Sequence, residues 1–276
     1  MTASIITESK IAASCCPTVD RVVVLKFGGS VLHDEIEVAQ CAREVSRWNR
    51  AGWKVVAVVS ALDGTTDRLI QQAARLSPSP DASATALLLS TGELAAAALL
   101  ALALTQQGSR ACVLTPGQIQ LLTAGEPQDS LAISVDAGLI RSRLEALDCV
   151  VVPGFVGVDE FGATTLLGRG GSDLTALFLA RNLKASCRLV KDVDGLYERD
   201  PAKDLSARRF DKASYETALR LSGTVGAIVQ SKAVQYAIAH GLEFEVGAVG
   251  RADGTLVSAA ADALVQTREL AGAVGR

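Results

Sequence analysis

The stretch Arg21–Leu32, RVVVLKFGGSVL, is the most informative part of this 276-residue chain. An apolar run of strand-forming residues ends at Lys26, and two glycines and a serine follow it. Glycines directly after a strand allow backbone N–H groups to approach a phosphate. The familiar P-loop, however, places its lysine after the glycines. Because the lysine comes first here, the stretch predicts a different kind of phosphate site at the end of a buried strand.

Short β-rich runs alternate with longer helical patterns along the chain. The expected strands are residues 21–26, 54–60, 110–114, 149–154, 186–191 and 243–248. The expected helices are residues 35–50, 64–76, 83–107, 133–146, 172–183, 213–222 and 229–240. Continuous apolar strands separated by helices favour an α/β fold with a mostly parallel sheet that helices cover on both faces. Ligands bind beyond the carboxyl ends of such strands. We therefore expect the functional residues just after Leu25, Val59, Val152 and Val190.

The composition excludes several classes of protein. Apolar residues make up 49% of the chain and the net charge is −3, so no basic surface favours nucleic acid. The most apolar stretch, ELAAAALLALALTQQG, is alanine-rich and begins with an acid, which predicts a buried helix and no membrane span. Residues 1–19 lack the pattern of a signal peptide and are expected to be a flexible lead-in.

Cysteine and histidine usage argues against a protein-held metal. The six cysteines form no C-x-x-C pair and only two histidines are present, so we expect no metal site built by protein side chains. Cys112, Cys149 and Cys187 lie in or beside apolar runs and are expected to be small core residues. This usage predicts a reduced, cytoplasmic protein.

Four polar, glycine-bearing segments follow the expected strand ends. They are Lys26–Ser30 (KFGGS), Ser60–Asp67 (SALDGTTD), Gly168–Asp173 (GRGGSD) and Lys191–Pro201 (KDVDGLYERDP). Any one of them could be an ordinary turn. Four such loops on one edge of one sheet indicate a functional site.

These segments resemble the amino acid kinase family and, within it, the catalytic domain of aspartokinases. K-F-G-G-[TS], S-A-x-x-G-x-T-[ND], G-R-G-G-S-D-x-T-A and D-V-D-G-x-Y-x-x-D-P all match in order, together with the pair Gly92-Glu93. The resemblance extends from about residue 21 to about residue 257. It implies the carbamate kinase-like fold and transfer of the ATP γ-phosphate to the β-carboxylate of L-aspartate, with Mg²⁺ as cofactor. It also implies a homodimer with a role in amino acid biosynthesis.

The resemblance also implies roles for particular residues. The catalytic pair would be Lys26 and Asp173. The substrate would be bound by Ser30, Ser60, Thr66, Glu93, Arg169 and Ser172. The nucleotide would be bound by Gly28, Gly29, Lys191, Asp192, Tyr197 and Lys203.

The chemistry of four of these side chains fits the implied roles. Lys26 would neutralise phosphate charge, which is the main task in phosphoryl transfer. Asp173 would orient Lys26 or a magnesium-bound phosphate, although a simple helix-start acid is the alternative. Arg169 would pair with the α-carboxylate through its planar fork. Glu93 would hold the substrate ammonium, and it too has a helix-start acid as the alternative.

The expected domain organisation follows from the same match. Residues 20–260 would form one amino acid kinase domain, with the amino acid on the N-terminal side and the nucleotide at about 186–257. Residues 261–276 would be a C-terminal tail. Aspartokinases usually continue into ACT domains that bind feedback inhibitors, and we expect no ACT domain in this chain.

Departures from the family pattern leave two alternatives open. Ile228 stands where the family has a lysine associated with nucleotide phosphate, Ala202 replaces an arginine, and Val31 replaces a second hydroxyl residue. Lys191 replaces a more usual hydroxyl residue and could supply part of the missing positive charge. The alternatives are a kinase for another acidic amino acid or related metabolite, and a non-catalytic relative that binds a ligand and regulates a partner.

Overall fold

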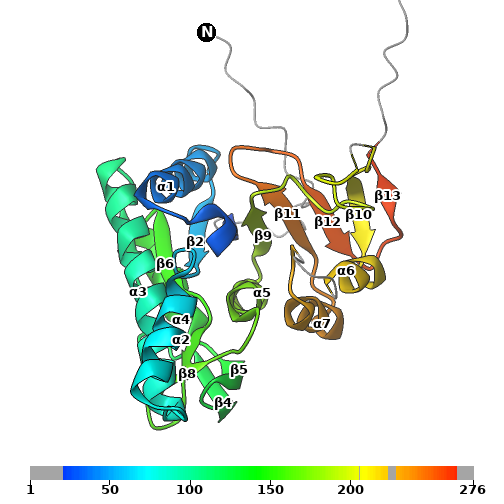
Figure 1. The fold of residues 1–276 in the computed structure, drawn as a ribbon. Helices are drawn as coiled ribbons and strands as arrows, with labels where there is room; N and C mark the ends of the chain where they lie inside the picture. The colour runs from blue at the N-terminus through cyan, green and yellow to red at the C-terminus, as the bar shows by residue number, and fades with distance from the viewer. Residues whose placement is uncertain (1–20, 205, 223–227, 266–276) are drawn as a thin grey trace, which may run out of the picture.

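Nine strands form the main sheet of the computed structural model, which describes residues 21–204, 206–222 and 228–265 (Figure 1). Their order across the sheet is β13 (Ala263–Leu264), β10 (Phe210–Ser214), β12 (Thr255–Ser258), β11 (Phe244–Ala248), β9 (Ser186–Lys191), β1 (Val22–Phe27), β2 (Lys54–Val59), β6 (Cys149–Pro153) and β3 (Ala111–Val113). The strands from β11 to β3 are all parallel, whereas β12 pairs with β11 and β13 pairs with β10 in the antiparallel sense. The predicted α/β class with a mostly parallel sheet is confirmed.

Helices cover both faces of the sheet. Helices α1 (Glu35–Arg50) and α3 (Ala82–Gln106) pack on one face, while α4 (Ala137–Ala146), α5 (Gly171–Leu183), α6 (Tyr215–Ser222) and α7 (Ser231–His240) pack on the other. Strand β1 contributes alternately to the two cores, with Val22 and Val24 on the α5 side and Val23, Leu25 and Phe27 on the α1 side. This double burial explains why the strand is a continuous apolar run.

Helix α3 is the longest helix among the described residues and the most apolar. By length and composition alone it could cross a membrane, since an 18-residue window has a mean hydropathy of 2.0. In the fold, however, it packs against α1, against the sheet and against α2 (Thr65–Leu76). Its inner face, which includes Ala96, Ala97, Leu100 and Leu104, is buried in the core. The expected buried helix is therefore present.

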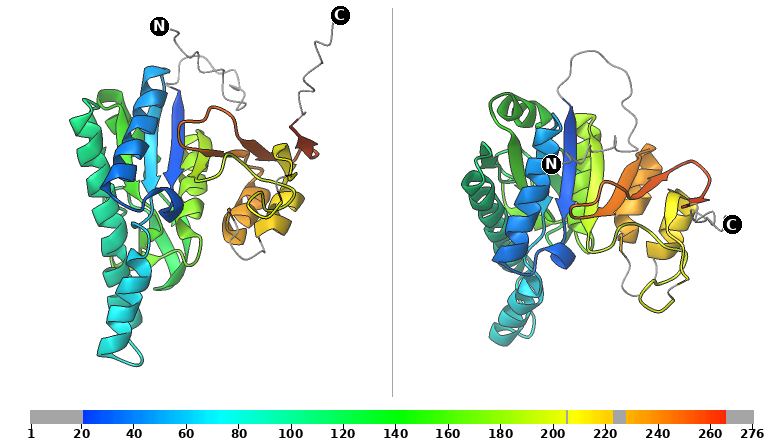
Figure 2. Two further views of the ribbon diagram at one scale, coloured as in Figure 1. Left: turned by 45° about the horizontal axis from the view of Figure 1, so that its top comes forward. Right: turned by 90° about the horizontal axis from the view of Figure 1, so that it is seen from above.

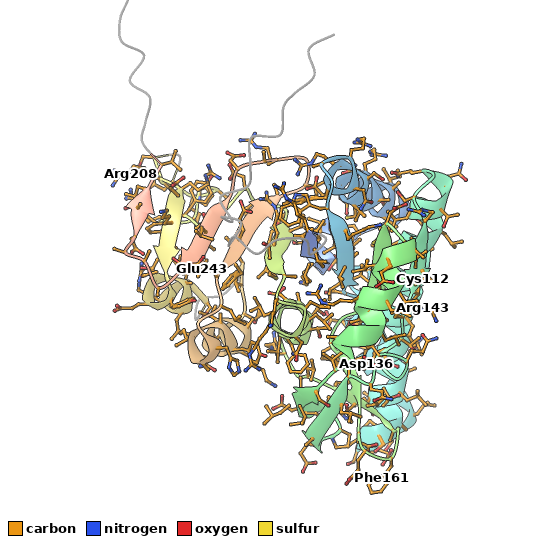
Figure 3. All side chains as sticks on the ribbon, turned by 180° about the vertical axis from the view of Figure 1, so that it is seen from behind. Cys112, Asp136, Arg143, Phe161, Arg208 and Glu243 are labelled. Atoms are coloured by element: carbon orange, nitrogen blue, oxygen red, sulfur yellow. The ribbon has the colours of Figure 1, made fainter. Side chains whose placement is uncertain are left out.

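A second, four-stranded sheet lies at one end of the molecule. Its order is β5 (Asp129–Ser134), β4 (Leu122–Glu126), β7 (Val156–Val158) and β8 (Thr164–Leu166). Strands β7 and β8 form an antiparallel hairpin after β6. Phe161 at its tip and Arg208, just before β10, lie near opposite ends of the molecule (Figure 3).

Several element boundaries differ from the expected ones, and three of the differences have a clear structural cause. The helix expected at 133–146 starts at Ala137, because Ile133 and Ser134 belong to β5 and the Asp136 carboxylate caps the helix by accepting from Leu139 N at 2.9 Å. The helix expected at 213–222 starts at Tyr215, because β10 occupies the preceding residues. The sheet extends past residue 260, where we expected the tail to begin, because β13 pairs with β10. The expected lead-in at 1–19 lies outside the described residues.

The chain divides into two sides around the middle of the main sheet. Figure 2 shows the blue-to-green half of the chain on one side and the yellow-to-red half on the other. Strands β1 and β9 are neighbours at this junction. Their carboxyl ends therefore bring residues from the two halves together.

Candidate functional site

A cleft of about 1250 Å³ opens at the carboxyl ends of the central strands. Every site residue expected from the sequence lines it, namely Lys26, Gly28, Gly29, Ser30, Ser60, Thr66, Glu93, Arg169, Ser172, Asp173, Lys191, Asp192, Tyr197 and Lys203. The volume exceeds that of a typical pocket for one small molecule, about 300–1,000 Å³. The cleft therefore has room for two ligands side by side.

A lysine–aspartate–lysine cluster lies in the cleft. Asp173 Oδ1 is 2.6 Å from Lys26 Nζ, and Lys191 Nζ donates to Asp173 Oδ1 and Oδ2 at 3.3 and 3.1 Å. All three side chains are buried. Two cations share one carboxylate, so the cluster carries one uncompensated positive charge that a phosphate could neutralise.

The parallel pairing of β1 and β9 creates this cluster. Lys26 is opposite Leu189 in the register, and both Lys26 and Lys191 occupy the side of the sheet on which α5 packs. Asp173 is the third residue of α5, which begins just after Gly170 in a left-handed conformation. The helix N-terminus thus points its positive end and its first-turn carboxylate at the two lysines.

Burial and charge change the pKa values of the cluster. Burial, opposed by the Asp173 carboxylate and assisted by the Lys191 ammonium, lowers the pKa of Lys26 to about 8. Burial alone would raise the pKa of Asp173, but the nearby Lys191 and Lys26 outweigh it and lower that pKa to about 2. Asp173 is therefore ionised at neutral pH and is not poised to act as a base.

Gly28 makes room for the Lys26 ammonium. A Cβ built at Gly28 would lie 2.7 Å from Lys26 Nζ, so a side chain there would displace the lysine head group. The backbone then turns through a short 3₁₀ helix, η1 (Gly29–Val31). The lysine therefore precedes the glycine that accommodates its head group.

Glu93 lies in the middle of α3 and not at a helix start, which corrects the sequence-based alternative for this residue. Gly92 permits the position, because a Cβ there would lie 3.0 Å from Ala61 Cβ and 3.1 Å from Thr65 Cγ2. The buried Glu93 carboxylate accepts from Ala61 N at 3.3 Å through Oε1, while Oε2 has no partner among the described residues. Burial raises its pKa to about 7. A cationic ligand group would satisfy this carboxylate.

Arg169 is exposed at the edge of the same cleft. Its guanidinium makes no hydrogen bond or ion pair with any residue that the structure describes. Gly168 and Gly170 on either side have φ values of +72° and +80°, which only glycine adopts readily. The loop therefore presents a free planar cation toward a ligand.

Three of the residues expected at the nucleotide are more exposed than the buried cluster. Asp192 lies exposed at the edge, Tyr197 donates its hydroxyl to Asp194 Oδ1 at 2.7 Å, and Lys203 makes an exposed ion pair with Asp200 at 3.3 Å. Ile228 also lines the cleft while packing partly against the core. No His, Cys, Asp or Glu cluster suited to a metal ion occurs in the described part of the chain.

Further polar residues line the cleft and were missed, among them Gln128 and Gln230. Gln128 lies in the turn between β4 and β5, and Gln230 directly precedes α7. The alternating residues on either side of Pro127 could have indicated the β4–β5 hairpin. For Gln230, the sequence holds no signal that we can identify.

The sequence profile of the amino acid kinase family matches residues 21–246. The chain belongs to the amino acid kinase family. The match spans both halves of the cleft and confirms the resemblance inferred from the motifs. The lysine–aspartate–lysine cluster lies within the matched region.

Aspartokinases are prominent among the similar proteins. "Aspartate kinase Ask_LysC" of Stutzerimonas stutzeri (strain A1501) is 39% identical over 216 residues, covering 78% of this chain and 52% of the relative. The solved structure of aspartate kinase from Synechocystis has a TM-score of 0.74 at 30% identity, covering 91% of this chain and 41% of that one. Escherichia coli aspartokinase III in complex with aspartate and ADP has a TM-score of 0.73 at 24% identity, covering 86% and 64%. This chain spans about half the length of the curated relatives it matches.

Proposed function

We propose that this protein is an aspartate kinase, which transfers the ATP γ-phosphate to the β-carboxylate of L-aspartate and releases 4-phospho-L-aspartate and ADP. The observation that carries the proposal is the arrangement of the cleft. A buried Lys26–Asp173–Lys191 cluster shares the cleft with Glu93 and Arg169. Among the described residues, Glu93 Oε2 and the Arg169 guanidinium have no partner. The similarity to aspartokinases supports the same substrate.

The free polar groups suit the two ends of an amino acid. The Arg169 fork pairs with the α-carboxylate, and the buried Glu93 carboxylate pairs with the α-ammonium. Ser30, Ser60, Thr66 and Ser172 supply further polar groups on this side of the cleft. A zwitterion held in this way directs its remaining carboxylate toward Lys26.

The reaction then needs positioning and charge neutralisation. A β-carboxylate oxygen attacks the γ-phosphorus, and the bond from that phosphorus to the β–γ bridging oxygen breaks with its electron pair leaving on ADP. The attacking carboxylate is already ionised at neutral pH, so no base is required. Lys26 neutralises the charge on the transferred phosphoryl group, and Asp173 orients Lys26.

The nucleotide lies on the side of the second half of the chain. Gly28 and Gly29 offer backbone N–H groups, Lys191 contributes a second cation, and Asp192, Tyr197 and Lys203 border the nucleotide. When bound, Mg²⁺ would further neutralise the phosphate charge. Because the described residues contain no metal-binding cluster, the ATP phosphates and water are its expected ligands. The homodimer and the cytoplasmic location inferred from the sequence remain predictions.

The activity is tested by trapping the acyl phosphate product with hydroxylamine. The purified chain is incubated with MgATP and, separately, with L-aspartate, L-glutamate and N-acetyl-L-glutamate, and hydroxamate formation is measured. We expect hydroxamate with aspartate and at least about tenfold less with the other two, because a misplaced reacting carboxylate loses the benefit of orientation. Preference for another acceptor would identify a different kinase. Absence of product with all three would favour the non-catalytic relative.

A further inference from the structure

Three segments that are far apart in the sequence meet at Lys232. This lysine is the second residue of α7, and its Nζ lies 2.7 Å from Asp129 Oδ1 at the start of β5. The same ammonium donates to Leu167 O at 2.6 Å, directly before the Gly168–Asp173 loop. The Lys232 side chain therefore connects three parts of the fold: the small sheet, the loop that carries Arg169, and helix α7.

The neighbours of Lys232 also contact both glycines that flank Arg169. A Cβ at Gly168 would collide with the Asp129 carboxylate and would lie 3.3 Å from Lys232 Nζ. A Cβ at Gly170 would collide with the side chain of Gln230, two residues before Lys232. The backbone on both sides of Arg169 is thus held closely, while the Arg169 guanidinium itself stays free.

We propose that Lys232, through its bridge between Asp129 and the Leu167 carbonyl, is a positioning residue that holds Arg169 in place for the amino acid substrate. The proposal rests on the proposed function insofar as that substrate is aspartate. Lys232 would not touch the substrate, because its ammonium is already engaged by two protein oxygens. It acts by fixing where the Arg169 backbone lies, and a displacement of about 1 Å can cost a factor of about a hundred in rate.

A purely structural role for Lys232 predicts a different outcome. The Lys232 side chain is 28% exposed and that of Asp129 is 72% exposed, so their ion pair should contribute little to global stability. A loss confined to the amino acid substrate therefore distinguishes positioning from general support. Lys54 offers a matched control, because its Nζ donates to Leu147 O at 2.7 Å and lies 3.7 Å from Asp148 Oδ1. Lys54 begins β2 and so lies at the amino end of this strand, whereas the cleft lies at the carboxyl ends.

The experiment measures KM for aspartate, KM for ATP, kcat and thermal stability in Lys232→Met, Lys232→Arg, Asp129→Asn and Lys54→Met. We expect Lys232→Met to raise KM for aspartate at least tenfold with KM for ATP changed less than twofold. Asp129→Asn should act in the same direction but more weakly, Lys232→Arg should recover part of the loss, and Lys54→Met should change neither KM. Equal loss toward both substrates, or a change in KM for aspartate below twofold, would overturn the proposal.

A double-mutant cycle tests whether Lys232 acts through Arg169. In an Arg169→Ala background the guanidinium is already absent, so Lys232→Met should add less than a twofold further loss. A full additional loss would show that Lys232 acts on the substrate by another route.

Hydrogen exchange keeps the proposal testable if the wild-type chain has no kinase activity. Gly171 N donates to Gly168 O at 2.9 Å, so this amide reports on the loop. Exchange at residues 168–171 should be faster in Lys232→Met than in Lys54→Met. Equal exchange in the two variants would overturn the positioning role, whereas inactivity of the wild type alone would overturn only the proposed function.

Discussion

Asp173 Oδ1 lies 2.6 Å from Lys26 Nζ, with both side chains almost completely removed from water. The same carboxylate also holds Lys191, so it compensates two buried ammonium groups. Removal of the Asp173 carboxylate should therefore affect the free energy of unfolding differently from removal of one lysine. A buried charge without a partner is far more costly than an intact buried pair.

Lys26→Met should abolish turnover without unfolding the protein. The fold should persist because Asp173 keeps Lys191 as its partner. The variant loses a transition-state contact worth about 3 kcal/mol, so kcat should fall by a factor of at least about a hundred. Asp173→Asn should also stop turnover and, in addition, cost about 3–5 kcal/mol of unfolding free energy, because two buried lysines lose their anion.

Denaturant unfolding of both variants at pH 6 and pH 9 checks this prediction. The pKa of Lys26 is already lowered to about 8, and loss of Asp173 removes an interaction that raises it. The penalty on this ammonium applies only while it is charged, so the stability loss in Asp173→Asn should be larger at pH 6 than at pH 9. Equal stability of Asp173→Asn and the wild type at pH 6 would show that the cluster is not as closely paired as the structure indicates.

The lowered pKa of Lys26 predicts a basic limb in the pH profile. Lys26 must carry its proton to neutralise phosphate, and in the free protein its pKa is about 8. The value of kcat/KM for MgATP should therefore fall as the pH rises through about 8, since this parameter reports the free enzyme. The limb of kcat should lie at higher pH, because bound phosphate stabilises the ammonium. Lys26→Arg, if it turns over, should lack the limb; a wild-type profile that stays flat to pH 9.5 would contradict the assignment.

The raised pKa of Glu93 predicts an acidic limb in the pH profile of kcat/KM for aspartate. Burial raises its pKa to about 7, so the carboxyl of the empty site gains a proton as the pH falls through that value. The protonated form cannot pair with the substrate ammonium, so kcat/KM for aspartate should decrease below about pH 7. Glu93→Gln should raise KM for aspartate by roughly ten- to a hundredfold, the cost of one charge-assisted hydrogen bond. It should also remove the limb, and a limb that persists in Glu93→Gln would exclude Glu93 as its source.

Arg169 should recognise the geometry of the α-carboxylate as well as its charge. Arg169→Lys keeps the charge but loses the planar fork, so it should be nearly as damaging as Arg169→Ala. Both variants should raise KM for aspartate by roughly ten- to a hundredfold and leave KM for ATP almost unchanged. If they lose ATP affinity and keep aspartate affinity, the Gly168–Asp173 loop belongs to the nucleotide.

Much of the fold was predictable from the sequence because its central strands are buried on both faces. Such strands are continuous apolar runs, and the expected ranges for β2 and β9 agree with the structure to within one residue. Strands β4, β5 and β10 were not predicted. They are partly exposed and lack a continuous apolar run. Because these short strands mix polar and apolar residues, their sequences are difficult to distinguish from those of loops.

The site was predictable in its members but not in its contacts. The resemblance implied that Asp173 orients Lys26, but no sequence pattern indicated that the same carboxylate also holds Lys191. That contact depends on β9 lying beside β1, which is a property of the sheet order. The contact of Glu93 with Ala61 and that of Lys232 with Leu167 depend in the same way on tertiary packing.

The identity of the trapped product tests the central claim most directly. Wild-type protein is incubated with MgATP, L-aspartate and hydroxylamine, and the aspartyl hydroxamate is compared with authentic α- and β-isomers by chromatography and mass spectrometry, with Lys26→Met as the blank. If Arg169 and Glu93 hold the α-groups and Lys26 faces the remaining carboxylate, the product is the β-hydroxamate and the blank yields none. The α-hydroxamate, or no hydroxamate from the wild type, would contradict this account.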